Sequence, residues 1–519
     1  MFHRITSKRA ARILLWIFIT LVTVMVLLFV WTNWSGQRRW AATKALLERE
    51  GEKLDFHKLL PETPPEEKNL LAIEPLRGIS EVVDQDEAKG EPGAKRKALA
   101  GLAWESGKTK MPAALGTSLG RRTAFEDWVR VAREAKLADV AADSPNAGRE
   151  MLAALDARLP VLKQLADEAV TRPQAMFTPS LNERKLPGML FSLQVPHYTI
   201  AQKLGSNLAL RARAAAAVGE AREVANTAVA MLRVGRACKV EPMLLGLLVG
   251  VTVDAQALEL LWEVLETKLL KEDELHQIQQ TLEASDVETA LLLAMRGELA
   301  VAVGSLEYLG DVAAGRTTAG RELDEVLSGH SSGMRRGWVR AIPSGLFDHW
   351  KSVLADVEMR HVIKPLKTAG LRAAIDDRDS LHEELGVHSN PWAHPDYVMA
   401  LITVPAVAQV SQTALMSQTK QRQAQAALAL ERFFFKMGRY PLRLDELVPE
   451  FVTSVPKDPC DGKAMRYRVT ESGRYVLWSV AVDGKDDDGK VNITKPEEVR
   501  SMKKPEYLGD WAWQYEPVK

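Results

Sequence analysis

The sequence predicts a mainly α-helical protein with an N-terminal transmembrane helix, a large helical extracytoplasmic domain and a small C-terminal α+β domain. Three patterns predict this class: a long apolar run near the N-terminus, apolar residues spaced three and four apart through the middle, and alternating apolar residues near the C-terminus. A chain of 519 residues is too long for one ordinary core, so we expect two or three folded units beyond the anchor.

Composition is that of a globular chain, with 46% hydrophobic and 26% charged residues. Lys plus Arg equals Asp plus Glu, at 68 each, so charge gives no reason to expect nucleic acid as a partner. Cys238 and Cys460 can pair in an oxidising compartment or remain two small buried residues, and the sequence leaves both readings open. The sequence has no CxxC pair for a thiolate zinc site.

Residues 13–34 are expected to form a membrane anchor. The segment Ile13–Trp31 has Thr20 and Thr23 as its polar side chains, and at about 1.5 Å per residue it can cross a hydrocarbon core of about 30 Å. The run is longer than the apolar core of a signal peptide and ends in Trp31 and Trp34, a residue type typical of the membrane interface. We therefore expect an anchor that is not cleaved.

The charges around the anchor predict its orientation. Residues 1–12 carry cations without acids, whereas the cations that follow the span are mixed with acids: Arg4, Lys8, Arg9 and Arg12 before it, and Arg38, Arg39, Lys44, Glu48 and Glu50 after it. The positive-inside rule then places the N-terminus in the cytoplasm and the bulk outside it. We expect a single-pass protein of the cytoplasmic membrane that contacts the lipid bilayer through Ile13–Trp34.

Residues 35–97 are expected to continue the helix and then to form a linker, because Pro61–Pro65 breaks a helix and Asp84–Lys97 is charged and contains glycine. Residues 98–394 have a helical pattern. Within them we expect two helices to meet at Gly219 as an αα-hairpin, and a buried core helix at Pro242–Val253.

Two segments of this middle region have other expected roles. Glycine recurs from Gly304 to Gly345, which predicts a loop that is either a domain linker or a mobile lid. Tyr397–Thr419 carries no charge, but its glutamines, serines and Pro405 argue against a second membrane span.

Residues 395–519 are expected to contain a long helix and a small α+β domain. The helix should end at Gly438, a residue suited to the left-handed C-terminal position. Two short alternating runs, Met465–Val469 and Tyr475–Ser479, flank Glu471-Ser472-Gly473 and predict a β-hairpin. The aromatic residues of the tail, Trp511, Trp513 and Tyr515, are expected to pack onto this domain.

The order of motifs here resembles the globular part of the major pseudopilins of type II secretion systems. The resemblance covers about residues 420–495 and consists of a long helix, Gly438-Arg439-Tyr440-Pro441, Val455-Pro456-Lys457-Asp458-Pro459, a short antiparallel sheet and an acidic glycine loop. A pseudopilin has its processed apolar helix directly before this part, whereas here the anchor lies far upstream and has no prepilin cleavage site. The resemblance therefore implies a pseudopilin-like fold without filament assembly. The whole arrangement also looks like a group of bacterial membrane proteins with one anchor, which implies no activity.

The resemblance also implies calcium, because the acidic loop of that family binds this ion through hard oxygen ligands. Asp483 matches a ligand position and Asn492 lies near a second one, while Asp486 and Asp488 are candidate substitutes. The spacing is not that of an EF-hand. A solvated acidic turn is the alternative, since Asp and Gly are also common in turns.

Motifs of known catalytic sites are missing from the sequence. His382, His388 and His394 are equally spaced but match no zinc motif, and HExxH, the Walker lysine and GxSxG are absent. The sequence therefore favours a scaffold or interaction protein of the bacterial envelope, with an envelope protein as partner and a link to secretion. The alternative is an envelope hydrolase, with acidic catalysts in the helical domain and residues 304–345 as its lid.

Overall fold

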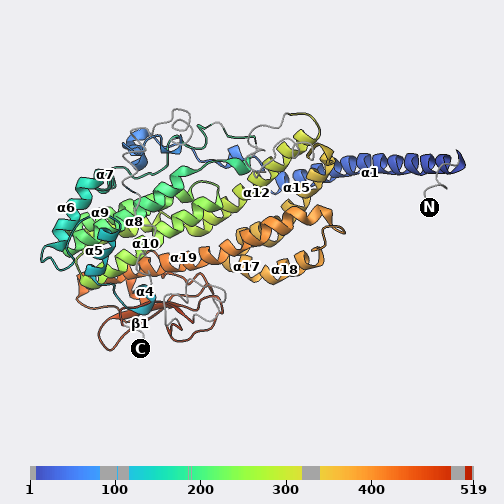
Figure 1. The fold of residues 1–519 in the computed structure, drawn as a ribbon. Coiled ribbons are helices and arrows are strands. Elements are labelled where there is room, and N and C mark those ends of the chain that lie inside the picture. The colour runs from blue at the N-terminus through green and yellow to red at the C-terminus, as the bar shows by residue number, and fades with distance from the viewer. Residues whose placement is uncertain are drawn as a thin grey trace.

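The computed structural model describes residues 8–81, 102, 116–184, 186–188, 190–317, 339–492 and 509–516. The fold is mainly helical, with a small antiparallel sheet near the C-terminus and a long apolar helix at the N-terminus, as predicted. The charged segment at residues 84–97 lies outside the described residues. In Figure 1 the helical body is elongated, helix α1 projects from one end, and the sheet lies below the other half.

The N-terminal half begins with the long apolar helix and continues through short 3-10 turns into the first helices of the body. Its elements are α1 (Lys8–Arg49), the 3-10 turns η2 (Phe56–Leu59), η3 (Glu66–Lys68), η4 (Leu70–Ala72) and η5 (Ile79–Glu81), then α4 (Gly116–Leu119), α5 (Phe125–Glu134), α6 (Ala147–Arg158), α7 (Pro160–Glu168) and η6 (Leu190–Ser192). Helix α1 thus continues beyond the apolar run, as the lack of a breaker after Trp34 predicts.

Long helices form the centre of the body. They are α8 (Pro196–Ala217), α9 (Ala221–Lys239), α10 (Leu244–Thr267), α11 (Glu272–Glu283) and α12 (Val287–Ala313). The predicted hairpin at Gly219 is confirmed, with α8 ending two residues before it and α9 starting two residues after it. The predicted core helix after Pro242 is confirmed as the first part of α10.

The remaining elements lead to the small sheet. They are α15 (Ser344–Glu358), the π-helix η7 (Met359–Ile363), α16 (Lys364–Ala369), α17 (Leu371–Asp376), α18 (Arg378–Val387), η8 (Pro395–Tyr397), α19 (Val398–Met437), η9 (Leu444–Leu447), β1 (Arg466–Val469), β2 (Tyr475–Ser479) and β3 (Trp511–Trp513). Gly438 closes α19 with φ at 70°, in the left-handed region, as predicted.

The sheet has the order β1-β2-β3 and is antiparallel throughout. Tyr467 pairs with Leu477, and Leu477 pairs on its other side with Trp513. The predicted hairpin and the predicted packing of the aromatic tail are both confirmed, because the tail supplies the third strand. Gly473 in the turn has φ at 77°, which favours glycine.

The prediction of a loop throughout residues 304–345 is wrong at both ends. Helix α12 continues through Gly304 and Gly310 to Ala313, and α15 already begins at Ser344. These glycines allow close packing, because a Cβ on Gly304 would lie 3.0 Å from Leu190 and one on Gly310 would lie 3.5 Å from Phe347. Residues 318–338 lie outside the described residues.

Helix α19 connects two hydrophobic clusters. Its C-terminal half, through Leu428 and Leu430, joins helices α5 to α11 and the sheet in one cluster. Its N-terminal half, through Val404 and Leu415, joins α12 and α15 to α18 in the other. Cys238 and Cys460 are both buried and remain free thiols, so they are not paired.

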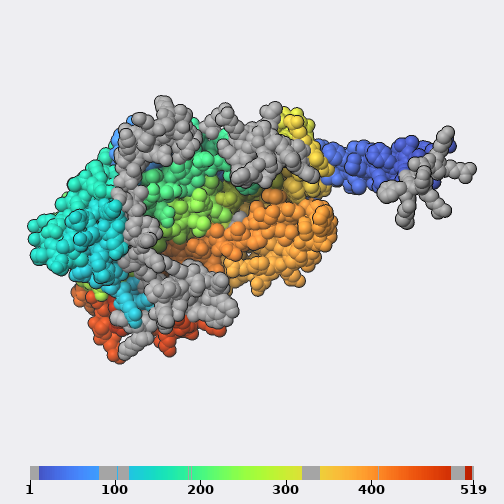
Figure 2. Space-filling view, viewed as in Figure 1, coloured from blue at the N-terminus to red at the C-terminus, as the bar shows by residue number. Residues whose placement is uncertain are grey.

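Among the described helices, four are long and apolar enough to cross a membrane, and their burial differs. The most apolar windows are 61% buried in Leu244–Thr267, 67% in Glu272–Ala313 and 35% in Pro395–Met437, but 0% in Ala11–Arg49. Figure 2 shows α1 as a rod protruding from the body. Exposed side chains such as Trp16, Phe18 and Leu27 surround this rod, which suits contact with lipid.

Candidate functional site

Helices α1 and α15 cross at two glycines. A Cβ added at Gly36 would lie 2.1 Å from the carbonyl oxygen of Gly345, and a Cβ added at Gly345 would lie 2.3 Å from the carbonyl oxygen of Thr32. Real Cβ contacts are essentially never shorter than 3.0 Å, so both positions require glycine at this spacing. Helix α1 therefore contacts the body through its backbone, directly after the apolar run.

Polar contacts fix the same crossing. The side-chain oxygen Oδ1 of Asn33 accepts hydrogen bonds from the backbone N–H of Gly345 at 2.8 Å and from the hydroxyl of Ser344 at 3.3 Å. The N-terminus of α15 thus gains an acceptor for its free N–H groups from another helix. Ser35 hydrogen-bonds His349 at 3.1 Å, one turn further along α15.

A buried ion pair holds the chain just past the C-terminal end of α1. The carboxylate of Glu52, whose side chain is 3% exposed, accepts two bonds from Arg296 of α12, at 2.6 and 2.9 Å, and one from Lys367 of α16 at 2.8 Å. Burial opposes the charge of Glu52, but the bonds to Arg296 and Lys367 prevail and lower its pKa. We call the contacts of Asn33, Ser35, Gly36 and Glu52 with α12, α15 and α16 the anchor clamp.

A hollow of about 600 Å³ lies beside the anchor clamp, between the C-terminal part of α1 and helix α12. Its lining carries charges of both signs, with Lys44, Glu48, Lys53 and Glu307 among them. Such a mixed lining gives the hollow little net charge and provides donors and acceptors for a polar ligand or a partner side chain.

A second polar group surrounds Glu384 of α18. Its carboxylate accepts bonds from Arg360 at 2.7 and 2.9 Å, contacts Nε2 of His361 at 2.8 Å and accepts from the Tyr397 hydroxyl at 3.2 Å. The bonds from Arg360, followed by that to His361, lower the pKa of Glu384 to about 2. Nδ1 of His361 faces Asp377 at 2.5 Å. This group joins η7, α18 and η8, with Asp377 lying between α17 and α18.

The π-helix η7 that carries Arg360 and His361 has a cause in the sequence. Pro365 has no N–H, so the carbonyl of His361 lacks the donor that a regular α-helix would provide four residues later. The wider π-turn precedes this proline directly. Such turns often occur at functional sites, and here the turn carries the two side chains that reach Glu384.

The equally spaced histidines are brought together in part. His388 is the C-cap residue of α18, stacks on Tyr397 with ring centroids 3.9 Å apart, and lies 4.7 Å from the ring of His394. His382 is exposed on α18 and belongs to neither contact. Within the described residues, no group of three or more His, Cys, Asp or Glu side chains is arranged to hold a metal ion.

The residues predicted for calcium lie around the end of the sheet, and the three aspartates among them make hydrogen bonds or ion pairs with neighbouring protein groups. Asp486 accepts from Nε1 of Trp478 at 2.9 Å and lies 3.5 Å from Arg466, while Asp488 accepts from Arg468 at 2.9 Å. Asp483 accepts from the backbone N–H of Lys485 at 3.1 Å, and Asn492 lies close to Gly509.

Asp510, which the sequence analysis did not single out, organises this acidic loop. One of its oxygens accepts from the N–H groups of Asp487 at 3.0 Å and Gly489 at 2.7 Å, and burial raises its pKa to about 6. Its other oxygen is buried and has no hydrogen-bond partner among the described residues.

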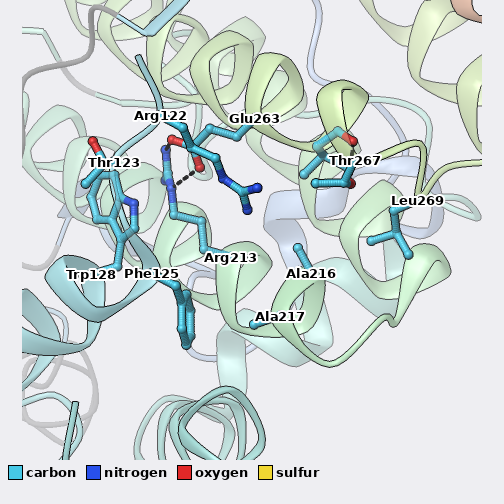
Figure 3. A pocket seen from close by; sticks show the side chains of 11 residues that line it. Arg122, Thr123, Phe125, Trp128, Arg213, Ala216, Ala217, Glu263, Thr267 and Leu269 are labelled. Atoms are coloured by element: carbon cyan, nitrogen blue, oxygen red, sulfur yellow. Dashed lines mark hydrogen bonds and ion pairs between the residues drawn. The ribbon is translucent and has the colours of Figure 1, made fainter. Parts of the chain in front are cut away.

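Figure 3 shows a smaller pocket of about 180 Å³ between α5, α8 and α10. Arg213 makes two bonds of 2.8 Å to Glu263 and stacks on Trp128 at 3.8 Å. Among its described lining residues, Glu263 is the one carboxylate, and Arg213 neutralises it. The pocket thus lacks the converging acids that the hydrolase alternative requires.

Sequence reasoning missed the anchor clamp and the group around Glu384. The pairs Gly36–Gly345 and Arg360–Glu384 join distant segments, and no local spacing marks them. A usable signal for the second group was the Arg360-His361 pair on a helix just before Pro365. Comparison with known proteins adds no further signal, because no family model, curated protein or solved structure matches the chain.

Proposed function

We propose that this chain is a membrane-anchored, extracytoplasmic scaffold or interaction protein of the bacterial envelope. The observation that supports it is the anchor clamp, which joins the apolar helix to the body without a flexible linker. A rigid junction of this kind would present a surface of the body at a fixed height and angle above the membrane, which suits a scaffold. The contacts of α1 with α15, and those of Glu52 just past α1 with α12 and α16, provide such a junction.

The proposed orientation has the N-terminus in the cytoplasm and the body outside it, based on the cations that precede the span. The sheet region is the part proposed to act near secretion machinery, because its motifs resemble the globular part of pseudopilins. The partner would be another envelope protein. The group around Glu384 and the hollow beside the anchor clamp are surfaces of the body that such a partner would meet close to the membrane.

Calcium binding by Asp483, Asp486, Asp488 and Asn492 stays a prediction. An ion would compete with Arg466 and Arg468 for the carboxylates of the loop, so binding would require these ion pairs to open. The partnerless buried oxygen of Asp510 adds a hard ligand close to the same loop. The Trp478 indole on Asp486 offers a spectroscopic reporter of such an event.

The orientation is tested with Leu442→Cys in intact cells. Leu442 is 79% exposed, and the two natural cysteines are buried, so the introduced thiol is the expected labelling site. We expect a membrane-impermeant maleimide to label it once the outer permeability barrier is opened and the cytoplasmic membrane is intact. Labelling that requires lysis of the cytoplasmic membrane would place the body in the cytoplasm and overturn the proposal.

The interaction role is tested by crosslinking in whole cells, followed by purification of the tagged chain from membranes. We expect at least one envelope protein to be recovered with the wild-type chain and to be lost from a Gly36→Leu variant, which opens the anchor clamp. The matched control Gly386→Leu lies on exposed helix surface with nothing within 4 Å of its Cβ position. Recovery of no envelope protein, or equal recovery with both variants, would contradict the scaffold.

A further inference from the structure

The connection between α18 and α19, residues 388–397, lies at the end of the body from which α1 projects (Figure 1). Two contacts tie it to the anchor region. Arg39 of α1 forms an ion pair with Asp396 at 3.0 Å, and Nε1 of Trp350 on α15 donates to the carbonyl of Pro395 at 2.6 Å. The connection is therefore fixed beside α1 at the level of Arg39.

This level falls at the membrane surface. Arg39 is five residues beyond Trp34, which is about 7.5 Å along a helix. The polar layer on each side of a bilayer is about 5–8 Å thick, which is half the difference between the total and the hydrocarbon thickness. If Trp34 marks the edge of the hydrocarbon, Asp396 lies near the outer edge of the headgroups.

Two large apolar side chains, one in the connection and one directly before it, are exposed to solvent. Trp392 is 93% exposed, and Val387, in the last turn of α18, is 68% exposed. An indole in water exposes a large apolar surface, whereas at a bilayer surface its ring enters the apolar boundary and its N–H remains hydrated.

The connection has an ordered shape that presents Trp392 at its turn. The backbone carbonyl of Asn390 accepts from the N–H groups of Ala393 and His394 at 3.1 and 2.9 Å, and its side chain accepts from the N–H of Trp392 at 3.0 Å. The stacked rings of His388 and Tyr397 close the base of the connection. The turn is thus already ordered before it meets a surface, so binding there would cost little further conformational entropy.

We infer that Trp392 inserts into the headgroup region of the same bilayer that α1 spans. The body then has two membrane contacts, the spanning helix and this turn, and together they restrict its tilt relative to the bilayer. The inference rests on the proposed membrane anchor. The occupant is the lipid surface because the turn lies at the height of the headgroups and is attached to the anchor helix itself.

The experiment uses the full-length chain in lipid vesicles with an environment-sensitive nitrobenzoxadiazole probe on Ala393→Cys. Residue 393 is exposed and neighbours Trp392, which stays in place, while the natural cysteines are buried. The matched control carries the probe on Leu442→Cys, just past the far end of the 40-residue helix α19. Lipids with a nitroxide on the headgroup serve as the quencher.

We expect quenching at residue 393 to be about twofold or more stronger than at residue 442, and we expect Trp392→Ala to abolish that difference. Equal quenching at both positions, or quenching at residue 393 that survives Trp392→Ala, would overturn the inference. A blue-shifted probe emission without quenching by the labelled lipid would indicate that the turn contacts a second copy of the chain, and it would also overturn the inference. Flotation of the vesicles separates the two proposals. Protein that floats with the vesicles but shows no quenching contradicts only the membrane contact of the turn. Protein that does not float contradicts the membrane anchor and therefore also the contact of the turn.

Discussion

The anchor clamp predicts that Gly36→Ala separates α1 from α15. The new Cβ would lie 2.1 Å from the Gly345 carbonyl oxygen, so the two backbones must move apart by about 1.3 Å to reach an ordinary contact of 3.4 Å. Overpacking of this kind costs about 1–3 kcal/mol. The hydrogen bond from the Gly345 N–H to Asn33, now 2.8 Å, would lengthen and be lost at about 1 kcal/mol. The expected loss of stability is therefore about 2–4 kcal/mol.

Two measurements check this magnitude on the full-length protein in detergent micelles. Denaturant unfolding, followed by tryptophan fluorescence, gives the change in the free energy of unfolding. Spin labels on the exposed positions Gln37→Cys of α1 and His382→Cys of α18 give the distance distribution between anchor and body. We expect the distribution to broaden in Gly36→Ala, because the anchor leaves its fixed position.

The matched control is Gly386→Ala, at an exposed helical glycine with open space around its Cβ position. Alanine there should stabilise by about 0.5–1 kcal/mol, because it lowers the entropy of the unfolded chain and favours helix. If Gly36→Ala behaves like Gly386→Ala in both measurements, the crossing of α1 and α15 does not hold the anchor, and the reasoning from the clamp fails.

Three further predictions concern buried charges and the acidic loop. Burial, with Glu298 nearby, raises the pKa of Glu358 from 4.5 to about 8, so the folded state retains a proton that the unfolded state loses. Stability should fall as pH rises from about 4.5 to 8, and Glu358→Gln should flatten this slope in urea titrations, whereas an unchanged slope would refute it. Glu384→Ala should destabilise by about 2 kcal/mol because it removes the carboxylate that Arg360, His361 and Tyr397 share, while the exposed neighbour Glu383→Ala should change stability by less than about 0.5 kcal/mol; similar losses would contradict this. If the acidic loop binds calcium, adding the ion should raise the melting temperature and terbium should luminesce when tryptophan is excited, and no response to ion or chelator would leave the loop as a turn.

The elements that the sequence predicted correctly depend on local signals. The apolar run after residue 12, the helix end at Gly438 and the hairpin at Gly473 each follow from a few neighbouring residues. The glycine-rich segment was misjudged because glycine has two uses. At Gly304 the absent Cβ makes room for Leu190 against a helix, and composition alone cannot distinguish this from a loop.

The candidate sites depend on pairs that the chain brings together over long separations. Asn33 meets Gly345, Glu52 meets Arg296, and these choices depend on how whole helices pack. Residue types give a weak hint, since a glycine directly after a membrane span suits a close helix contact. The partner of that glycine can be any of several small residues, so the three-dimensional structure is needed to select Gly345.

A rigid junction makes the orientation of the whole body depend on the tilt of one helix. Membrane helices tilt by about 20° on average, and α19, with 40 residues, extends about 60 Å from the anchored end. A 20° change in tilt would therefore move the far end of α19, where the sheet packs, by about 20 Å. A scaffold cannot present a surface reproducibly with such freedom. The proposed contact of Trp392 with the headgroups, to one side of α1, would restrict this tilt, so loss of either membrane contact should let the sheet region move.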